Sequence, residues 1–154
     1  MATTGARPEV RFRPSFPLVE SKLRPLAARG TVPRTRLVAR LADPAGPRVV
    51  SLVAPPGYGK TTALVQWADL EGRPVAWLTI DDLDNDPAIL VSYLAAAFDR
   101  IAPVDPAIAS ALSGTGERLL GFAIPRLASS LHAWDRPAAL VVDDVHRLVA
   151  HASL

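Results

Sequence analysis

The feature that most constrains the fold of this chain is a short loop between an apolar run and a helical pattern. The loop reads Ala54, Pro55, Pro56, Gly57, Tyr58, Gly59, Lys60, Thr61 and Thr62. A β-branched run at 49–53 precedes it, and apolar residues recur after it at helical spacing. This order of strand, loop and helix is the setting that a phosphate-binding loop requires.

The residue types in the loop suit a triphosphate. Phosphate oxygens need several backbone N–H donors at close range, and Gly57 and Gly59 let the backbone approach without a Cβ in the way. The helix that starts near Lys60 points its N-terminus at the same anion. Lys60 would reach the β- and γ-phosphates, and the Thr61 hydroxyl would ligate Mg²⁺.

Two details bear on how specific this loop is. Ala54 stands where the usual pattern opens with Gly, so an ordinary strand-to-helix turn is the alternative interpretation. The chain has 17 basic residues, and only Lys22 and Lys60 among them are lysines. A lysine in this loop therefore indicates a position that favours a compact point charge.

A second motif, at 138–144, is an apolar run that ends in two carboxylates. Its length and continuity predict a strand buried on both faces of a parallel sheet. Ligands of open α/β sheets bind at the carboxyl ends of strands, so Asp143 would hold Mg²⁺ through water. Asp144 would orient or deprotonate a water molecule, or else be a helix N-cap or a solvated loop acid.

The composition narrows the class of protein. A chain of 154 residues is one domain or part of one. It has no Cys, no apolar run near ~18 residues and no signal-peptide core at its start, so we expect a cytoplasmic protein without a membrane segment. Residues 1–50 carry ten Lys or Arg and three Asp or Glu, so this part of the chain is basic. We interpret it as a solvated leader, with some arginines that bind phosphates or form ion pairs, rather than as an arm that binds nucleic acid.

The patterns divide the chain into three parts. Residues 1–17 read as a disordered leader, 18–46 as an N-terminal segment with a short helix at 34–42, and 47–154 as the core. Strands are predicted at 48–53, 74–80 and 138–143. Helices are predicted at 60–70, 87–101, 105–112 and 120–131, the last kinked or restarted by Pro125.

The acidic stretch 81–87 resembles the opening of a calcium loop, with Asp82, Asp84 and Asp86 at the right spacing. Pro87 replaces the Gly that the turn needs, and Tyr93 stands where the bidentate Glu belongs. We therefore predict a helix start instead, with Asp86 as N-cap and Pro87 in the first turn.

The motifs and their order resemble one family, the large ATP-binding LuxR-type transcriptional regulators related to MalT, within the STAND class of P-loop NTPases. The resemblance covers about residues 20–150. It is carried by the segments 21–25, 32–37, 54–62, 76–81, 84–87 and 140–146. A loop that opens with Ala is typical of that family.

The resemblance implies more than the residues do. It implies the three-layer α/β sandwich of a P-loop NTPase, with ATP and Mg²⁺ used as a switch, and slow hydrolysis. Val32 and Arg34 would lie near the adenine and the phosphates. In the whole regulator, ATP with an inducer drives self-association, and a C-terminal helix-turn-helix binds DNA.

The chain departs from the family by ending at Leu154. The strand that lies between the loop strand and the Asp143 strand in such folds is absent, as are the helical repeats and the DNA-binding module. We therefore expect an incomplete sheet with two unpaired edges, a poorly stable chain, and weak ATPase activity at most.

Two other functions stay open. A small P-loop kinase would need an acceptor site and an arginine-rich lid, and the arginines beyond the loop are scattered. A non-enzymatic docking or decoy partner would bind the exposed sheet of a longer relative.

Overall fold

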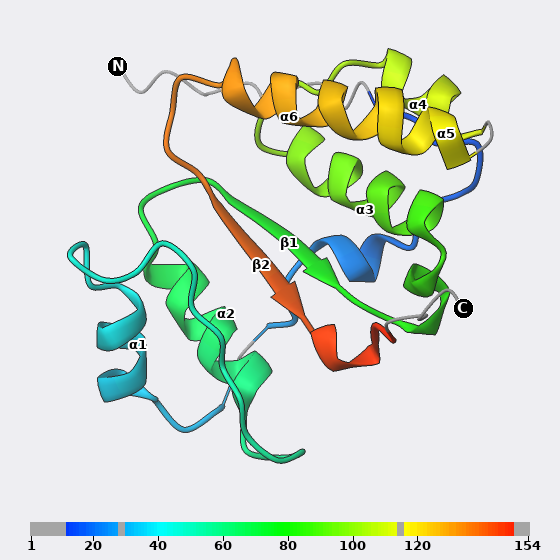
Figure 1. Cartoon of the computed structure of the whole chain (residues 1–154). Helices are drawn as coiled ribbons and strands as arrows, with labels where there is room; N and C mark the ends of the chain where they lie inside the picture. The colour runs from blue at the N-terminus through cyan, green and yellow to red at the C-terminus, as the bar shows by residue number, and fades with distance from the viewer. Residues whose placement is uncertain (1–11, 28–29, 114–115, 150–154) are drawn as a thin grey trace.

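The fold is a two-stranded parallel sheet with helices on both faces (Figure 1). The computed structural model describes residues 12–27, 30–113 and 116–149. Its α-helices are α1 (Thr35–Leu41), α2 (Lys60–Leu70), α3 (Pro87–Asp99), α4 (Ala107–Leu112), α5 (Gly116–Arg118) and α6 (Ile124–His132). Its strands are β1 (Val75–Thr79) and β2 (Ala139–Asp143), and its short 3₁₀ turns are η1 (Glu20–Leu23), η2 (Asp82–Asn85) and η4 (Val145–Arg147). Within the described ranges, no helix is long and apolar enough to cross a membrane.

The sheet brings together segments that lie far apart in the sequence. β1 and β2 pair in parallel, with Val75 opposite Ala139 and Thr79 opposite Asp143. The backbone N–H of Ile80 extends the pairing by donating to the Asp143 carbonyl at 2.9 Å. Parallel pairing places the carboxyl ends of both strands at one edge of the molecule, as the sequence motifs require of a ligand site.

Two separate cores pack against the two faces of the sheet. Ala76 and Leu78 of β1 point to the larger core, which α3, α4 and α6 complete. Trp77 points the other way and packs with Val141 and the inner faces of α1 and α2. The alternation of side chains along a strand explains this division, because successive residues face opposite sides of the sheet. The arrangement is that of a partial α/β fold.

Most of the predicted elements form where the local patterns place them. The helices at 34–42, 60–70, 87–101 and 105–112 and the strands at 74–80 and 138–143 are confirmed, with ends within about two residues. Pro125 does restart the last predicted helix. A π-helical turn at Leu119–Ala123 comes first, and α6 begins at Ile124 with Pro125 in its first turn.

The prediction of a strand at 48–53 is wrong for this structure. No strand forms there, and Val49 and Val53 are 86% and 90% exposed. A β-branched run favours a strand only when a neighbouring strand offers backbone partners, and in the described part of the chain no strand lies beside this segment. The strand predicted at 138–143 forms as β2, but it is not buried on both faces as predicted, because Leu140 is 41% exposed.

The predicted leader differs from the structure at its C-terminal end. Residues 1–11 lie outside the described residues, whereas Phe12 is 1% exposed and joins the larger core. Its backbone N–H donates to the buried carboxylate of Asp99 at 2.9 Å. Phe16 packs on the same core, with its ring centroid 5.9 Å from that of Tyr93. The segment from Phe12 onward therefore belongs to the packed domain.

A buried ion cluster holds η1 against η2. Lys22 donates from Nζ to Asp84 Oδ2 at 2.6 Å and lies 3.1 Å from Asp81 Oδ2. Its ammonium also lies 4.1 Å from the centroid of the Tyr93 ring. Desolvation raises the pKa of the Asp81 carboxyl. The hydrogen bond and charge of Lys22, together with backbone hydrogen bonds from Leu83 and Asp84, outweigh it and leave that pKa below its ordinary value.

Candidate nucleotide-binding site

The glycine-rich loop enters α2 through two left-handed residues. Gly57 has a φ of +81° and Gly59 a φ of +75°, and Gly59 is the N-cap of α2. Side chains other than glycine adopt such angles at a cost, so both positions require glycine for the loop to fold in this way. The turn directs the first backbone N–H groups of α2 toward the loop, and such groups have no partner within the helix.

The Lys60 side chain folds back over the loop. Its Nζ donates to the carbonyl oxygens of Ala54 at 2.8 Å and Pro55 at 3.2 Å. The ammonium therefore lies on the loop, above the backbone that a phosphate would contact. A flexible four-carbon side chain can turn from these carbonyls to an arriving anion.

Arg34, which precedes α1, reaches the same loop from a segment 24 residues earlier. Its Nη2 donates to the Tyr58 carbonyl at 3.2 Å. A Cβ at Gly59 would lie 3.4 Å from that guanidinium nitrogen, which is van der Waals contact, so the two groups are close neighbours. The structure thus brings the Arg34 side chain to the loop.

Gln66 of α2 holds the segment that carries Val32 and Arg34. Its Oε1 accepts from the Arg34 backbone N–H at 2.8 Å, and its Nε2 donates to Thr31 Oγ1 at 3.2 Å and to the Val32 carbonyl at 3.0 Å. Neither Gln66 nor Thr31 belongs to a recognisable motif of the sequence. A polar residue in an amphipathic helix gives no sign of a partner 35 residues away, so only the structure identifies this contact.

Asp143 is the last residue of β2 and Asp144 follows it, at the end of the molecule that also carries the N-terminus of α2 (Figure 1). Asp143 is 5% exposed, and its Oδ1 accepts from the Asp144 backbone N–H at 3.0 Å. Asp144 has a φ of +56°, the one positive φ among the described non-glycine residues. Aspartate tolerates this region better than most residues, and such backbone strain clusters at functional sites.

The donor set suits Mg²⁺ held with a nucleotide rather than a metal site made by the protein alone. In the described residues, no group of three or more His, Asp or Glu side chains comes together. Mg²⁺ usually keeps several waters and takes one or two protein oxygens plus substrate phosphates. The Thr61 hydroxyl and the Asp143 carboxylate are oxygen ligands of that kind.

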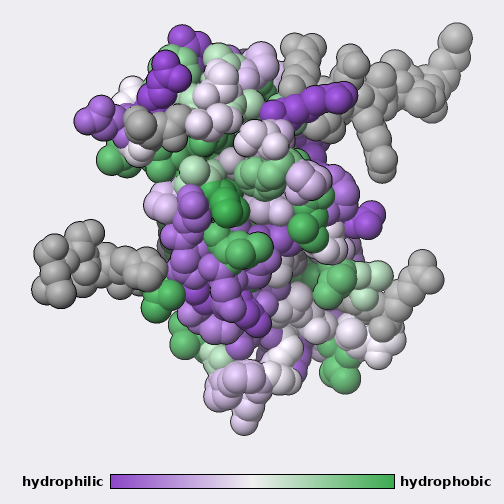
Figure 2. Space-filling model, turned by 90° about the vertical axis from the view of Figure 1, so that its right-hand side faces the viewer, coloured by the Kyte–Doolittle hydropathy of each residue, from purple (hydrophilic) through white to green (hydrophobic). Residues whose placement is uncertain are grey.

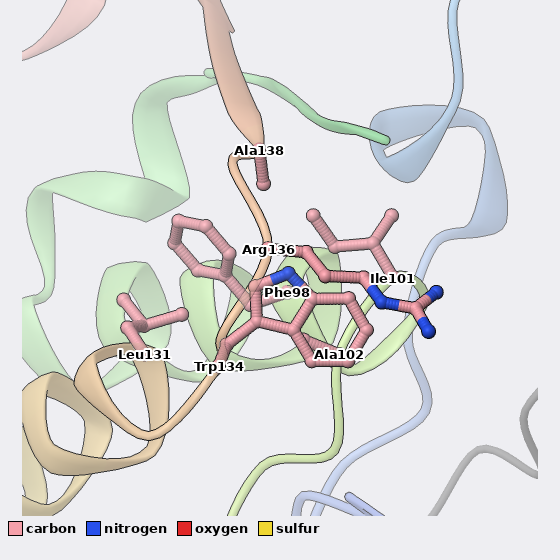
Figure 3. A pocket seen from close by; sticks show the side chains of 7 residues that line it. All are labelled: Phe98, Ile101, Ala102, Leu131, Trp134, Arg136 and Ala138. Atoms are coloured by element: carbon pink, nitrogen blue, oxygen red, sulfur yellow. The ribbon is translucent and has the colours of Figure 1, made fainter. Parts of the chain in front are cut away.

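A pocket between α3, α6 and the start of β2 lies away from this loop (Figure 3). It has a volume of about 200 Å³ and is mostly apolar. Its lining residues come from the C-terminal end of α3, from α6 and from the link to β2: Phe98, Ile101, Ala102, Leu131, Trp134, Arg136 and Ala138. Ala138 precedes β2, so the pocket opens about 16 Å along the strand from Asp143. It is not part of the predicted nucleotide site.

Curated relatives share the name of one transcriptional regulator. The chain is 36% identical over 131 residues to the HTH-type transcriptional regulator MalT of Cronobacter sakazakii, a match that covers 84% of this chain and 14% of the relative. It is 37% identical over 131 residues to MalT of Serratia proteamaculans, with the same shares covered. It is 34% identical over 137 residues to MalT of Yersinia enterocolitica, covering 88% of this chain and 15% of the relative.

The chain therefore spans about a seventh of the length of the curated relatives it matches. No family model matches the chain, and no solved structure matches it with significance.

Proposed function

We propose, because the chain is homologous to part of the MalT-type transcriptional regulators, that it is the ATP- and Mg²⁺-binding switch module of such a regulator. One observation carries the nucleotide part of this proposal. Gly57 and Gly59 turn the loop into the N-terminus of α2, and Lys60 lies on the loop carbonyls. Backbone donors, a helix N-terminus and a mobile cation then meet at one place, which is what a triphosphate requires.

The residues of the site fit the nucleotide and its metal ion. The loop 54–62 would bind the phosphates, with Lys60 at the β- and γ-phosphates and Arg34 beside them. Val32 is 75% exposed, and its apolar side chain is available to a flat adenine ring. Thr61 would ligate Mg²⁺ directly and Asp143 would hold it through water.

The regulator as a whole would use this module as a switch, with little hydrolysis. Asp144 is the one residue that we assign to water activation, and its backbone strain supports that assignment. DNA binding would belong to another region, in line with the name of the relatives, and self-association would follow ATP binding. We propose a cytoplasmic location, as for any protein that acts on bacterial DNA.

The test is the affinity for ATP in the full-length protein with and without the Lys60 ammonium. Lys60→Ala should weaken binding by about 10- to 100-fold, because a charge-assisted hydrogen bond is worth roughly 1.5–3 kcal/mol. Isothermal titration calorimetry with ATP and Mg²⁺ measures this directly. Lys60→Arg is the matched control that keeps the charge but not the compact ammonium. An unchanged affinity in Lys60→Ala would exclude the nucleotide assignment.

A second candidate, a non-enzymatic docking partner, is favoured by one feature of the surface. Val49 and Val53 are largely exposed, and the two-stranded sheet of the described residues has unpaired edges. Exposed apolar residues and unpaired strand edges are both suited to pairing with another chain. A complex with a longer relative that forms equally well with and without ATP would support this candidate over the switch.

A further inference from the structure

We propose that Gln66 is a positioning residue for the nucleotide, which holds the segment 31–34 against the phosphate loop. The inference rests on the proposed function and adds to it a residue outside the loop 54–62. The Gln66 side chain joins α2 to the segment that carries Val32 and Arg34. In the proposed site, the N-terminus of α2 faces the phosphates.

The Gln66 amide uses both of its ends, and this fixes its orientation. Its oxygen accepts from the Arg34 N–H, and its nitrogen donates to Thr31 Oγ1 and to the Val32 carbonyl. These are three of the four hydrogen bonds that a glutamine amide can make. A reversed amide would set its NH₂ against the Arg34 N–H and its oxygen against the Val32 carbonyl, so only one orientation satisfies all partners.

The segment that Gln66 holds is also anchored at its C-terminal end, where the Val38 N–H of α1 donates to the Arg34 carbonyl at 2.9 Å. Residues 31–34 are in no regular element, and their side chains are exposed. Loops without regular hydrogen bonding are mobile, and a ligand must then meet the entropy cost of ordering them. Two hydrogen bonds from Gln66 to the backbone and one to the Thr31 hydroxyl restrict this segment before any ligand arrives, which lowers that cost.

The same contacts connect the segment to the loop itself. Arg34 is held at its backbone by Gln66 and donates from its side chain to the Tyr58 carbonyl at 3.2 Å. The guanidinium lies beside Gly59, 3.4 Å from where a Cβ would stand on that residue. A continuous path therefore runs from α2 through Gln66 and Arg34 to the phosphate loop. It fixes the distance between the phosphates and the exposed face of Val32.

The proposed role of Gln66 predicts different effects on ligands with and without an adenosine group. If Gln66 positions the 31–34 segment, its loss should weaken ligands that carry adenosine more than ligands that carry phosphates alone. Arg34, which we place at the phosphates, keeps its bonds with the Val38 N–H and the Tyr58 carbonyl, whereas the Val32 carbonyl loses its bond from Gln66. We therefore propose to measure the affinities of the full-length protein for ATP and for inorganic tripolyphosphate, with Gln66→Ala as the variant. ATP binding should fall about tenfold, the equivalent of roughly one hydrogen bond, and tripolyphosphate binding by no more than about threefold.

Two further variants complete the experiment. Gln66→Glu keeps an acceptor for the Arg34 N–H but opposes the Val32 carbonyl with a carboxylate, so it should weaken ATP at least as much as alanine does. Lys60→Ala should weaken both ligands. Equal affinity of the wild type and Gln66→Ala for ATP, or equal losses for both ligands, would overturn the role of Gln66 while leaving the proposed function intact. Failure of the wild type to bind either ligand would overturn both.

Discussion

At the scale of single residues, the Lys22 ion cluster does most to fix the N-terminal segment. The side chains of Lys22 and Asp84 are 8% and 0% exposed, so both charges are taken out of water. Such a burial is tolerated because the ammonium meets Asp84, Asp81 and the face of the Tyr93 ring. Desolvation largely offsets the attraction within a buried pair, so the cluster contributes more to a defined position of η1 than to net stability.

Removal of one partner should nevertheless be costly. Asp84→Ala leaves the Lys22 charge buried with only the half-exposed Asp81 carboxylate beside it, and we expect it to lower the free energy of unfolding by about 3 kcal/mol. Urea denaturation of the variant measures this loss. The matched control replaces both partners with apolar residues, Lys22→Met with Asp84→Leu, and should recover most of the stability. A loss below about 1 kcal/mol in Asp84→Ala would contradict the assignment.

The same scale shows what the sequence could and could not predict about the site. The loop 54–62 is recognisable because its glycines and its lysine are consecutive, and the structure gives Gly57 and Gly59 the left-handed angles that such a loop needs. Gln66 and the partner of Lys22 were not predictable. Each forms its contact over more than 30 residues, and nothing in the local pattern specifies which distant group it meets.

At the scale of elements, the segment 84–87 serves three connections at once. The Asp84 carboxylate accepts a hydrogen bond from the Lys22 ammonium. The Asn85 side chain donates to the Arg147 carbonyl at 3.1 Å and accepts from the Val149 N–H at 2.7 Å. Asp86 then caps α3, as predicted, by accepting from the N–H groups of the second and third helical residues at 2.7 and 3.3 Å. The segment thus joins the N-terminal part, the C-terminal part and the longest helix.

The cap of α3 allows a clean measurement. Asp86→Ala should destabilise the domain by about 1 kcal/mol, because it leaves two backbone N–H groups at the start of α3 without their acceptor. Asp86→Asn keeps a good capping side chain and is the matched control, which should stay within about 0.5 kcal/mol of the wild type. Chemical denaturation compares the three proteins. Equal losses in both variants would indicate that charge, not capping geometry, stabilises this helix end.

Helices were predicted more reliably than strands for a physical reason. A helix such as α3 depends on signals within its own sequence, namely its cap, a proline at its start and its apolar face. A strand depends on backbone partners elsewhere in the chain. β1 and β2 have each other as partners, whereas 48–53 has an equally suitable apolar sequence but no neighbouring strand in the described residues.

At the scale of the whole molecule, large apolar residues are exposed at several places along the described part of the chain, from Val19 to Val149. On the side shown in Figure 2, hydrophobic residues form separate patches among hydrophilic ones, which is ordinary for a protein surface. Segment 48–53 differs, because Val49, Val50 and Val53 are at least half exposed within five residues, immediately before the phosphate loop. These exposed valines therefore lie next to the proposed nucleotide site in the sequence.

This arrangement predicts how amide exchange should vary along the chain. In the 154-residue chain, the N–H groups of 49–53 should exchange with deuterium at near-unprotected rates, since no described strand accepts their hydrogen bonds, while those of β1 should be protected by pairing with β2. Hydrogen-exchange mass spectrometry on peptides that cover both segments makes the comparison. The two segments have similar apolar sequences, so β1 is the internal control for β-propensity.

A longer protein of the relatives' kind should behave differently at this one segment. The P-loop fold that the resemblance implies has a strand at 48–53 within the sheet, and a strand supplied from outside these 154 residues would provide its partners. Protection at 49–53 should therefore rise to the level of β1 in the longer protein, while β1 itself changes little. Strong protection of 49–53 already in the 154-residue chain would contradict the structure described above. Its absence in the longer protein would contradict the P-loop sheet.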